Sequence, residues 1–178
     1  MNATLRAVCN LLKSEASDVQ RAAAIVLGRV GASDAAVSKT LGEALARTTR
    51  PEVADAILAA LVENPHEQSV RHLLDALENE AVPREGVLDA VAGAGPKALP
   101  ALRKAFAEAS LEVQVGIAEV APRICNDQAS AFLIDLLQAE AMEVVRAAVH
   151  SLRESIGAYN KKEANQLFQR LKAGLQNK

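Results

Sequence analysis

The sequence has very few aromatic side chains: 2% of its 178 residues are Phe, Tyr or Trp, and Trp is absent. Half of the residues are nevertheless hydrophobic, so Ala, Leu and Val must supply most of the core. Sheet proteins favour β-branched and aromatic residues, whereas closely spaced helices accommodate Ala and Leu. Sustained period-two alternation and Asn-Gly hairpin turns are also missing. The sequence therefore predicts an all-α fold.

Other absences exclude whole classes of function. The net charge of −2 gives no global field for nucleic acid or an anionic membrane. No apolar run reaches the roughly 18 residues that span a bilayer, and residues 1–15 lack the pattern of a secretory signal. Cys9 and Cys125 lie far apart without metal-ligand spacing, so we expect two buried thiols. These features favour a cytoplasmic protein with no nucleic-acid or membrane partner.

What the sequence does contain is a helical pattern, clearest over residues 17–31. Ser17 and Gln20 have the S-x-x-Q spacing of a capping box, and Gly31 suits a left-handed residue that ends a helix. Apolar residues recur at three- and four-residue steps, at Val19, Ala22, Ala23, Val26, Leu27 and Val30. A single helix cannot bury a stripe of this width by itself.

The pattern returns four times, at spacings of 30 to 34 residues. The positions equivalent to Val19 are Val53, Pro83, Val113 and Val144. Those equivalent to Ala23 are Ile57, Val87, Ile117 and Ala148, and those equivalent to Leu27 are Leu61, Val91, Ala121 and Leu152. The position of Ala22 is small in every copy, as Ala56, Gly86, Gly116 and Ala147, which predicts that a neighbouring backbone passes close to it.

A second apolar run precedes each copy, so the repeating unit is predicted to be helix, short turn, helix. The expected repeats cover residues 3–31, 34–64, 66–95, 96–125 and 128–157, and a C-terminal capping helix covers 161–176, all within one domain of residues 1–178. Each pair would hide its stripe only by stacking on its neighbours, as in a solenoid. The alternative for the last helix is a detachable segment that binds a membrane or a partner.

Several segments resemble a known repeat family. Residues 18–31 read D-V-Q-R-A-A-A-x-x-L-G-R-V-G, residues 98–102 read A-L-P-A-L, and residues 143–148 read E-V-V-R-A-A. These resemble the short HEAT repeats of the phycobilisome-lyase type, and the resemblance covers almost all of residues 3–157. It implies a right-handed α-solenoid with first helices on the convex side and second helices on the concave side. Members of the family mostly act as binding scaffolds.

Three comparisons with enzymes fail on the residues present. Residues 93–98 fit G-x-G-x-x-A, but they follow a helix rather than a strand. His66-Glu67 is similar to the His-Glu pairs of deoxyhypusine hydroxylases, di-iron enzymes that need several converging pairs, and this chain has one. HEAT-like DNA glycosylases need a basic concave face and aromatic side chains. We therefore predict no enzyme activity, no catalytic residue, no cofactor and no metal ligand.

On the expected concave face, acidic and basic side chains are segregated. The positions predicted to be exposed there include Gly28 and its equivalents. The candidate partner-binding residues are Arg21, Asp55, Glu85, Asp89, Glu119, Arg146, His150 and Arg153. The acidic ones cluster in the middle repeats and the basic ones at the C-terminal end, which suits a partner protein or peptide with a basic centre and an acidic end. The alternatives are an ordinary solvated surface, a regulatory subunit that docks through its convex face or C-terminal cap, and, third, a bilin-lyase-like or hydroxylase-like enzyme.

Overall fold

The computed structural model describes residues 2–31, 34–63, 66, 69–124 and 126–156, together with 165, 168, 169 and 172. Every regular element in these ranges is a helix, and they contain no strand, so the all-α prediction is confirmed. Most of the expected capping helix at 161–176, as well as Cys125, lies outside the described residues.

The helices alternate with short turns along the chain. Their bounds are α1 Ala3–Leu11, α2 Ser17–Val30, α3 Ala35–Arg47, α4 Pro51–Glu63, α5 Val70–Asp75 with the 3-10 turn η2 Ala76–Glu78, α6 Arg84–Gly93, the 3-10 turn η3 Gly95–Ala98, α7 Leu99–Phe106, α8 Leu111–Ile124, α9 Asn126–Leu136 and α10 Met142–Ile156.

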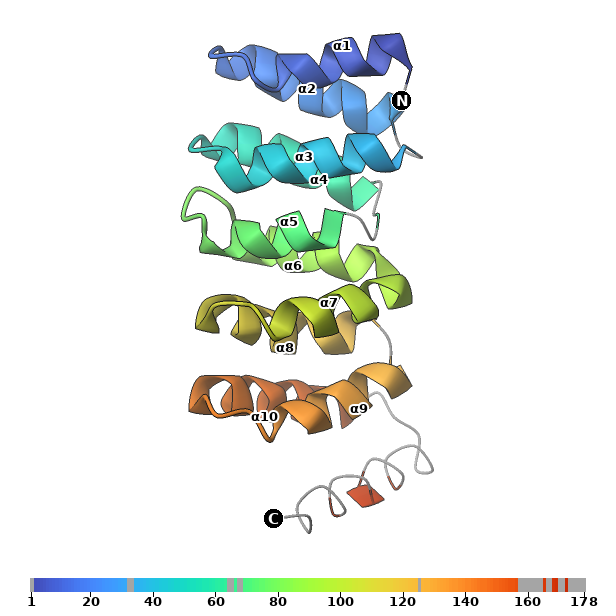
Figure 1. Cartoon of the computed structure of the whole chain (residues 1–178), viewed down its shortest axis with the longest axis vertical. Coiled ribbons are helices and arrows are strands. Elements are labelled where there is room, and N and C mark those ends of the chain that lie inside the picture. The colour runs from blue at the N-terminus through green and yellow to red at the C-terminus, as the bar shows by residue number, and fades with distance from the viewer. Residues whose placement is uncertain are drawn as a thin grey trace.

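These helices form two layers that run along the long axis of the molecule (Figure 1). In one layer α2 packs against α4, α4 against α6, α6 against α8 and α8 against α10. In the other layer α1 packs against α3, α3 against α5 and α5 against α7. We call these the second-helix layer and the first-helix layer. Each helix pair contacts chiefly the pairs before and after it, so residues at the same repeat position recur at regular intervals along each layer.

Residues at equivalent positions of the second helices lie in the core. The residues at the Ala23 position are at most 2% exposed: Ala23, Ile57, Val87, Ile117 and Ala148. Those at the Leu27 position are at most 4% exposed: Leu27, Leu61, Val91, Ala121 and Leu152. All ten belong to one continuous hydrophobic cluster that runs between the layers. The Ala23 and Leu27 positions of the inferred stripe are therefore buried in every second helix, whereas Val19, Val26 and Val30 of α2 are exposed.

The small-residue position does not have the expected role in every pair. A Cβ on Gly116 would lie 2.5 Å from Leu77 Cδ1, so a leucine tip, not a backbone, fills that space. The close backbone approach is at Gly28, where a Cβ would lie 3.0 Å from Ala60 Cα. Gly28 is buried, and its placement among exposed positions was wrong, because α4 packs directly on that side of α2.

Two expected end signals of α2 also differ from the structure. Gly31 has φ −97°, not a left-handed value, and its N–H donates to Leu27 O. The Gln20 side chain does not form a capping box with Ser17; its amide donates to Leu12 O at 3.1 Å. Gln114 occupies the equivalent position in α8 and donates to Phe106 O, also at 3.1 Å. In α2 and α8, the glutamine at this position joins the second helix to the end of the first helix before it.

Candidate functional site

The second-helix layer carries a surface groove between α6, α8 and α10. Its volume is about 480 Å³, and it is lined by Glu85, Leu88, Glu119, Pro122, Arg123, His150, Ser151 and Glu154. We call it the α6–α10 groove. Three successive second helices contribute to it, because the layer sets them side by side with the same face toward solvent.

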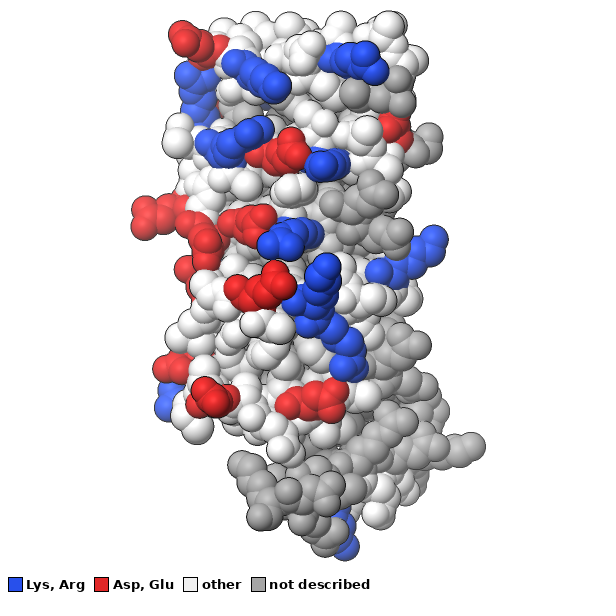
Figure 2. Space-filling model, in the orientation of Figure 1, with Lys and Arg blue, Asp and Glu red and all other residues white. Residues whose placement is uncertain are grey.

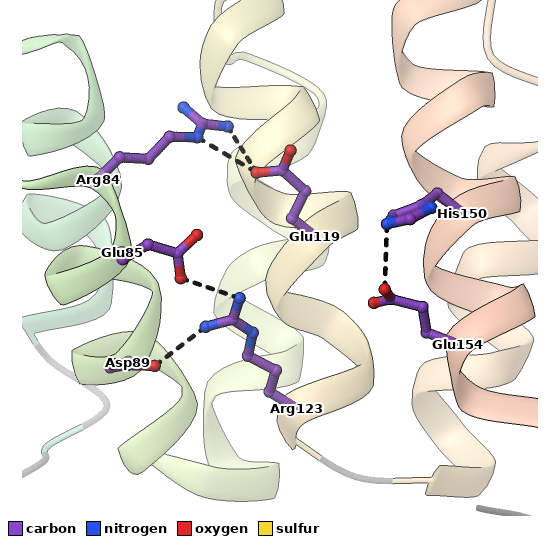
Figure 3. Close-up of polar contacts among 7 residues, drawn as sticks. All are labelled: Arg84, Glu85, Asp89, Glu119, Arg123, His150 and Glu154. Carbon is purple, nitrogen blue, oxygen red and sulfur yellow. Dashed lines mark hydrogen bonds and ion pairs between the residues drawn. The ribbon is translucent and has the colours of Figure 1, made fainter. Parts of the chain in front are cut away.

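Arg123 of α8 forms the centre of the groove (Figure 3). Its Nη1 donates to Asp89 Oδ1 at 3.0 Å, and its Nη2 donates to Glu85 Oε2 at 3.1 Å. Glu85 and Asp89 are four residues apart on α6, so both carboxylates lie on one side of the helix. The guanidinium fork therefore joins two turns of α6 to α8.

A second set of pairs runs in the opposite direction, from an arginine of α6 to acids of α8. Arg84 donates to Glu119 Oε2 from Nη2 at 2.8 Å and from Nε at 3.3 Å. Its Nη1 also lies 3.7 Å from Glu112 Oε1. Glu119 is half-buried and is the most shielded of the predicted acids. The helices α6 and α8 are thus held by reciprocal ion pairs across their exposed edge.

The α10 side of the groove is separate from this network. His150 Nε2 lies 3.2 Å from Glu154 Oε1, one turn away on the same helix, and this contact is an ion pair only when the imidazole is protonated. Figure 3 shows the pair across the groove from Glu119 and Arg123. The groove therefore has one wall whose charges are joined across helices and one wall whose charges pair along a single helix.

The structure brings together half of the predicted binding residues. Glu85, Glu119 and His150 line the groove, and Asp89 lies beside it through Arg123. The others are exposed on the second helices outside this lining: Arg21 on α2, Asp55 on α4, and Arg146 and Arg153 on α10.

Three charged side chains of the groove and its ion pairs were missed by the sequence reasoning: Arg84, Arg123 and Glu154. Arg123 and Glu154 occupy equivalent positions in their repeats. Each directly follows a residue equivalent to Gly28, a position that was assigned to the exposed face. Arg84 occupies the position of Gln20 and Gln114. Comparing the next position of each repeat as well would have found two of the three, Arg123 and Glu154. The predicted acidic centre is consequently less negative than expected, because two arginines neutralise most of its carboxylates.

Neither a metal-binding cluster nor an activated thiol is found among the described residues. No group of three His, Cys, Asp or Glu among them is placed to hold a metal ion. Burial raises the pKa of the Cys9 thiol, although a hydrogen bond with Thr40 opposes the shift. Such a thiol stays protonated at neutral pH and is a poor nucleophile. His66 is described, whereas its neighbour Glu67 lies outside the described residues.

The face over the first-helix layer mixes charges of both signs. Figure 2 shows Lys and Arg interspersed with Asp and Glu from the first pair to the last, with white area between them. Such a mixture gives no extended field of one sign. Among the described helices, none has both the length and the hydropathy that crossing a membrane requires.

Comparisons with known proteins give no family. No family model matches the sequence, and no curated protein matches it significantly. Three solved structures, each a crystal structure of an engineered protein, are similar in shape. The first is 20% identical, with 99% of this chain and 90% of that chain covered and a TM-score of 0.48. The second is also 20% identical, with 99% and 98% covered and a TM-score of 0.45, and the third is 19% identical, with 96% and 51% covered and a TM-score of 0.40.

Proposed function

We propose that this protein is a non-catalytic, cytoplasmic scaffold that binds a segment of a partner protein along its second-helix layer. In this proposal residues 1–178 form one right-handed HEAT-like α-solenoid, closed by the helix expected at 161–176, and the partner segment lies in the α6–α10 groove. The observation that carries the proposal is the groove itself, to which three successive helix pairs contribute exposed charged side chains.

The ion pairs of the groove favour exchange with a ligand. The side chains of Glu85, Asp89 and Arg123 are all exposed, and an exposed pair contributes only about 0 to 1 kcal/mol to stability. A lysine or arginine of a partner can therefore replace Arg123 as the counter-ion of Glu85 or Asp89 at low cost. Pro122, which is partly exposed, adds apolar surface between these charges.

The distribution of charge indicates the chemistry of the partner segment. Carboxylates outnumber arginines on the groove lining, whereas Arg146 and Arg153 are exposed on α10 beside it. A segment with a basic centre and an acidic end matches this arrangement. Screening over about 8 Å at physiological salt makes such charges act mainly on association rate and specificity.

Charge reversal in the groove tests this function. After the partner has been identified by affinity capture, its dissociation constant is measured for the wild type and for the double variant Glu85→Lys, Asp89→Lys. We expect the double variant to bind at least about tenfold more weakly, which is about 1.4 kcal/mol. The control is Glu140→Lys, an exposed acid in the turn before α10, which leaves affinity unchanged. Equal affinity of wild type and double variant would contradict groove binding.

A second cleft supports the alternative of a regulatory subunit that docks through its first-helix layer. This cleft lies between α1 and α3, has a volume of about 520 Å³, and has Arg6, Lys13, Arg47 and Glu43 on its lining. Three cations and one acid favour an acidic partner surface. If the groove variant binds normally and Arg6→Glu, Arg47→Glu does not, this alternative replaces the first.

A further inference from the structure

In α6 and α8, one side of the second helix packs against the preceding helix pair. In α6 a Cβ on Gly86 would meet Leu58 Cδ1 of α4 at 2.8 Å, and in α8 Gly116 faces Leu77 of η2. Gly86 and Gly116 are the repeat equivalents of Ala22. The same side of α2 is therefore the side on which a preceding pair would pack, and in the described chain nothing packs there.

Exposure at equivalent positions shows how unusual this side of α2 is. Val26 is 43% exposed, whereas its four equivalents are at most 3% exposed: Ala60, Ala90, Val120 and Ser151. Val19 is 37% exposed, whereas Val53, Val113 and Val144 are at most 6% exposed; the fourth equivalent, Pro83, is exposed. The Val26 position is thus buried in every later pair and the Val19 position in three of the four, whereas both are open to solvent in the first pair.

Together with α1, this side of α2 forms an apolar groove of about 330 Å³. Its lining is Val8, Leu11, Asp18, Val19, Ala22, Ala23 and Val26, of which only Asp18 is polar. We call this surface the leading edge; it lies at the end of the stack formed by α1 and α2, where much of the rim over α1 is uncharged in Figure 2. Ile25 and Val30 of α2 are also strongly exposed. Contiguous apolar surface of this kind marks a site of association.

The two charges on α2 beside this surface are arranged for self-association. Asp18 is in the first turn and Arg29 in the last, and 11 residues of α-helix place them about 20° apart around the axis. Both are exposed. If two copies of α2 pack antiparallel about a two-fold axis that crosses the helix midway between the levels of Asp18 and Arg29, Asp18 of each copy faces Arg29 of the other.

Side-chain size is complementary in the same arrangement. Ala22 of one copy then faces the larger Ile25 and Val26 of the other, which lets the two helices approach closely. A two-fold contact uses the same patch on both copies and closes on itself. Head-to-tail stacking lacks this fit, because Gly28, against which α4 packs, is replaced in α10 by the exposed Arg153.

We propose that the leading edge binds a second copy of this protein, with α2 packed antiparallel to α2 of the partner about a two-fold axis. The pairing covers Val19, Ala22 and Val26 on both copies, and it joins each Asp18 to the Arg29 of the other copy. This inference does not rest on the proposed function, because the α6–α10 groove lies on later helices and stays open in the dimer.

Sedimentation equilibrium of the full chain over a wide micromolar range tests the proposal. We expect a monomer–dimer equilibrium for the wild type and at least about tenfold weaker dimerisation for Val26→Glu, since each substitution occurs twice in a two-fold interface. Val62→Glu on α4, where the valine is 45% exposed, is the matched control and keeps the wild-type equilibrium. Helical circular dichroism shows that each variant is folded.

A charge swap separates the two-fold arrangement from other contacts and needs no change in the apolar surface. Asp18→Arg and Arg29→Asp should each weaken dimerisation, and the double variant Asp18→Arg, Arg29→Asp should restore it. A wild type that stays monomeric throughout, assemblies that grow beyond a dimer, or a double variant without restored pairing would each overturn the proposal.

Discussion

Asn79 joins the third helix pair to the second through a single side chain. Its amide Nδ2 donates to Thr48 O at 2.7 Å and lies 3.3 Å from Leu45 O, so it satisfies carbonyls at the C-terminal end of α3. Its Oδ1 accepts from the Ala81 N–H at 3.0 Å, which fixes the turn before α6. The last carbonyls of a helix have no hydrogen-bond donor within the helix. Here one asparagine of the next repeat supplies that donor.

We predict that Asn79→Asp destabilises the protein by about 1 to 3 kcal/mol, because a carboxylate replaces a donor beside several carbonyl oxygens. The free energy of unfolding is measured by urea denaturation near neutral pH. Asn10→Asp, at an exposed position of α1, is the control and should change stability by less than about 0.5 kcal/mol. Equal effects of the two substitutions would show that the contacts of Asn79 contribute nothing.

At the scale of the elements, α2 and α4 approach most closely at Gly28. A Cβ on Gly28 would lie 2.8 Å from Ala60 Cβ and 3.0 Å from Ala60 Cα, and a backbone atom cannot rotate away as a side chain can. At Gly86 the corresponding neighbour is Leu58 Cδ1, the tip of a flexible side chain. The two glycines therefore differ in the rigidity of what they face.

This difference predicts opposite results for two chemically identical substitutions. Gly28→Ala should destabilise by about 1 to 3 kcal/mol, because the helices must move apart. Gly86→Ala should be neutral or stabilising, since Leu58 can move and alanine is a better helix former than glycine by about 1 kcal/mol. Thermal and urea denaturation of both variants measure the difference. A stable Gly28→Ala variant would contradict the close approach of α2 and α4.

The ion pairs between α6 and α8 are expected to contribute little to folding. Arg123 and its two acidic partners are exposed, so we predict that Arg123→Gln changes the free energy of unfolding by less than about 1 kcal/mol. Denaturation at low and at high salt measures this, and the salt dependence should also be small. A larger loss would mean that Arg123 is a structural residue, and the exchange of its partners proposed for the groove would then be costly.

The elements themselves could be predicted from the sequence because their signals are local. Apolar spacing placed Ala23 and Leu27 in the core, and every equivalent of these residues is buried. Gly28 could not be placed in this way. Its burial depends on how α4 crosses α2, and periodicity within one helix carries no information on the position of its neighbour.

The groove could be predicted only in part, for a related reason. Glu85, Asp89 and Glu119 were found because they occupy repeat positions that were assigned to the exposed face. Arg123 was missed because a long side chain reaches its partners from an adjacent row, and Arg84 was missed because its row is filled by glutamine in α2 and α8. Charge patterns along a repeat array thus show where acids gather, while the pairing of those acids depends on side-chain reach between helices.

At the scale of the whole molecule, a helix pair in the middle of the stack packs against a neighbouring pair on both of its sides. The pair at the end of the stack has such a neighbour on one side. Among the described helices, α4 packs against both α2 and α6, whereas α2 has a packed neighbour in its layer on one side only. Where stability is a sum over repeats and interfaces, the first pair lacks one interface. It should open locally at a lower free energy than the middle pairs.

Amide hydrogen exchange followed by mass spectrometry measures this order directly. At low protein concentration we expect slower exchange in α4, α6 and α8 than in α1 and α2. Raising the concentration should slow exchange in α2, because pairing of the leading edge supplies the missing interface, and should leave α6 unchanged. In Val26→Glu the concentration dependence of α2 should vanish while the middle helices keep their protection. Uniform protection from α1 to α8 at low concentration would contradict stability that is summed over neighbouring pairs, because a single cooperative unit opens all its helices together.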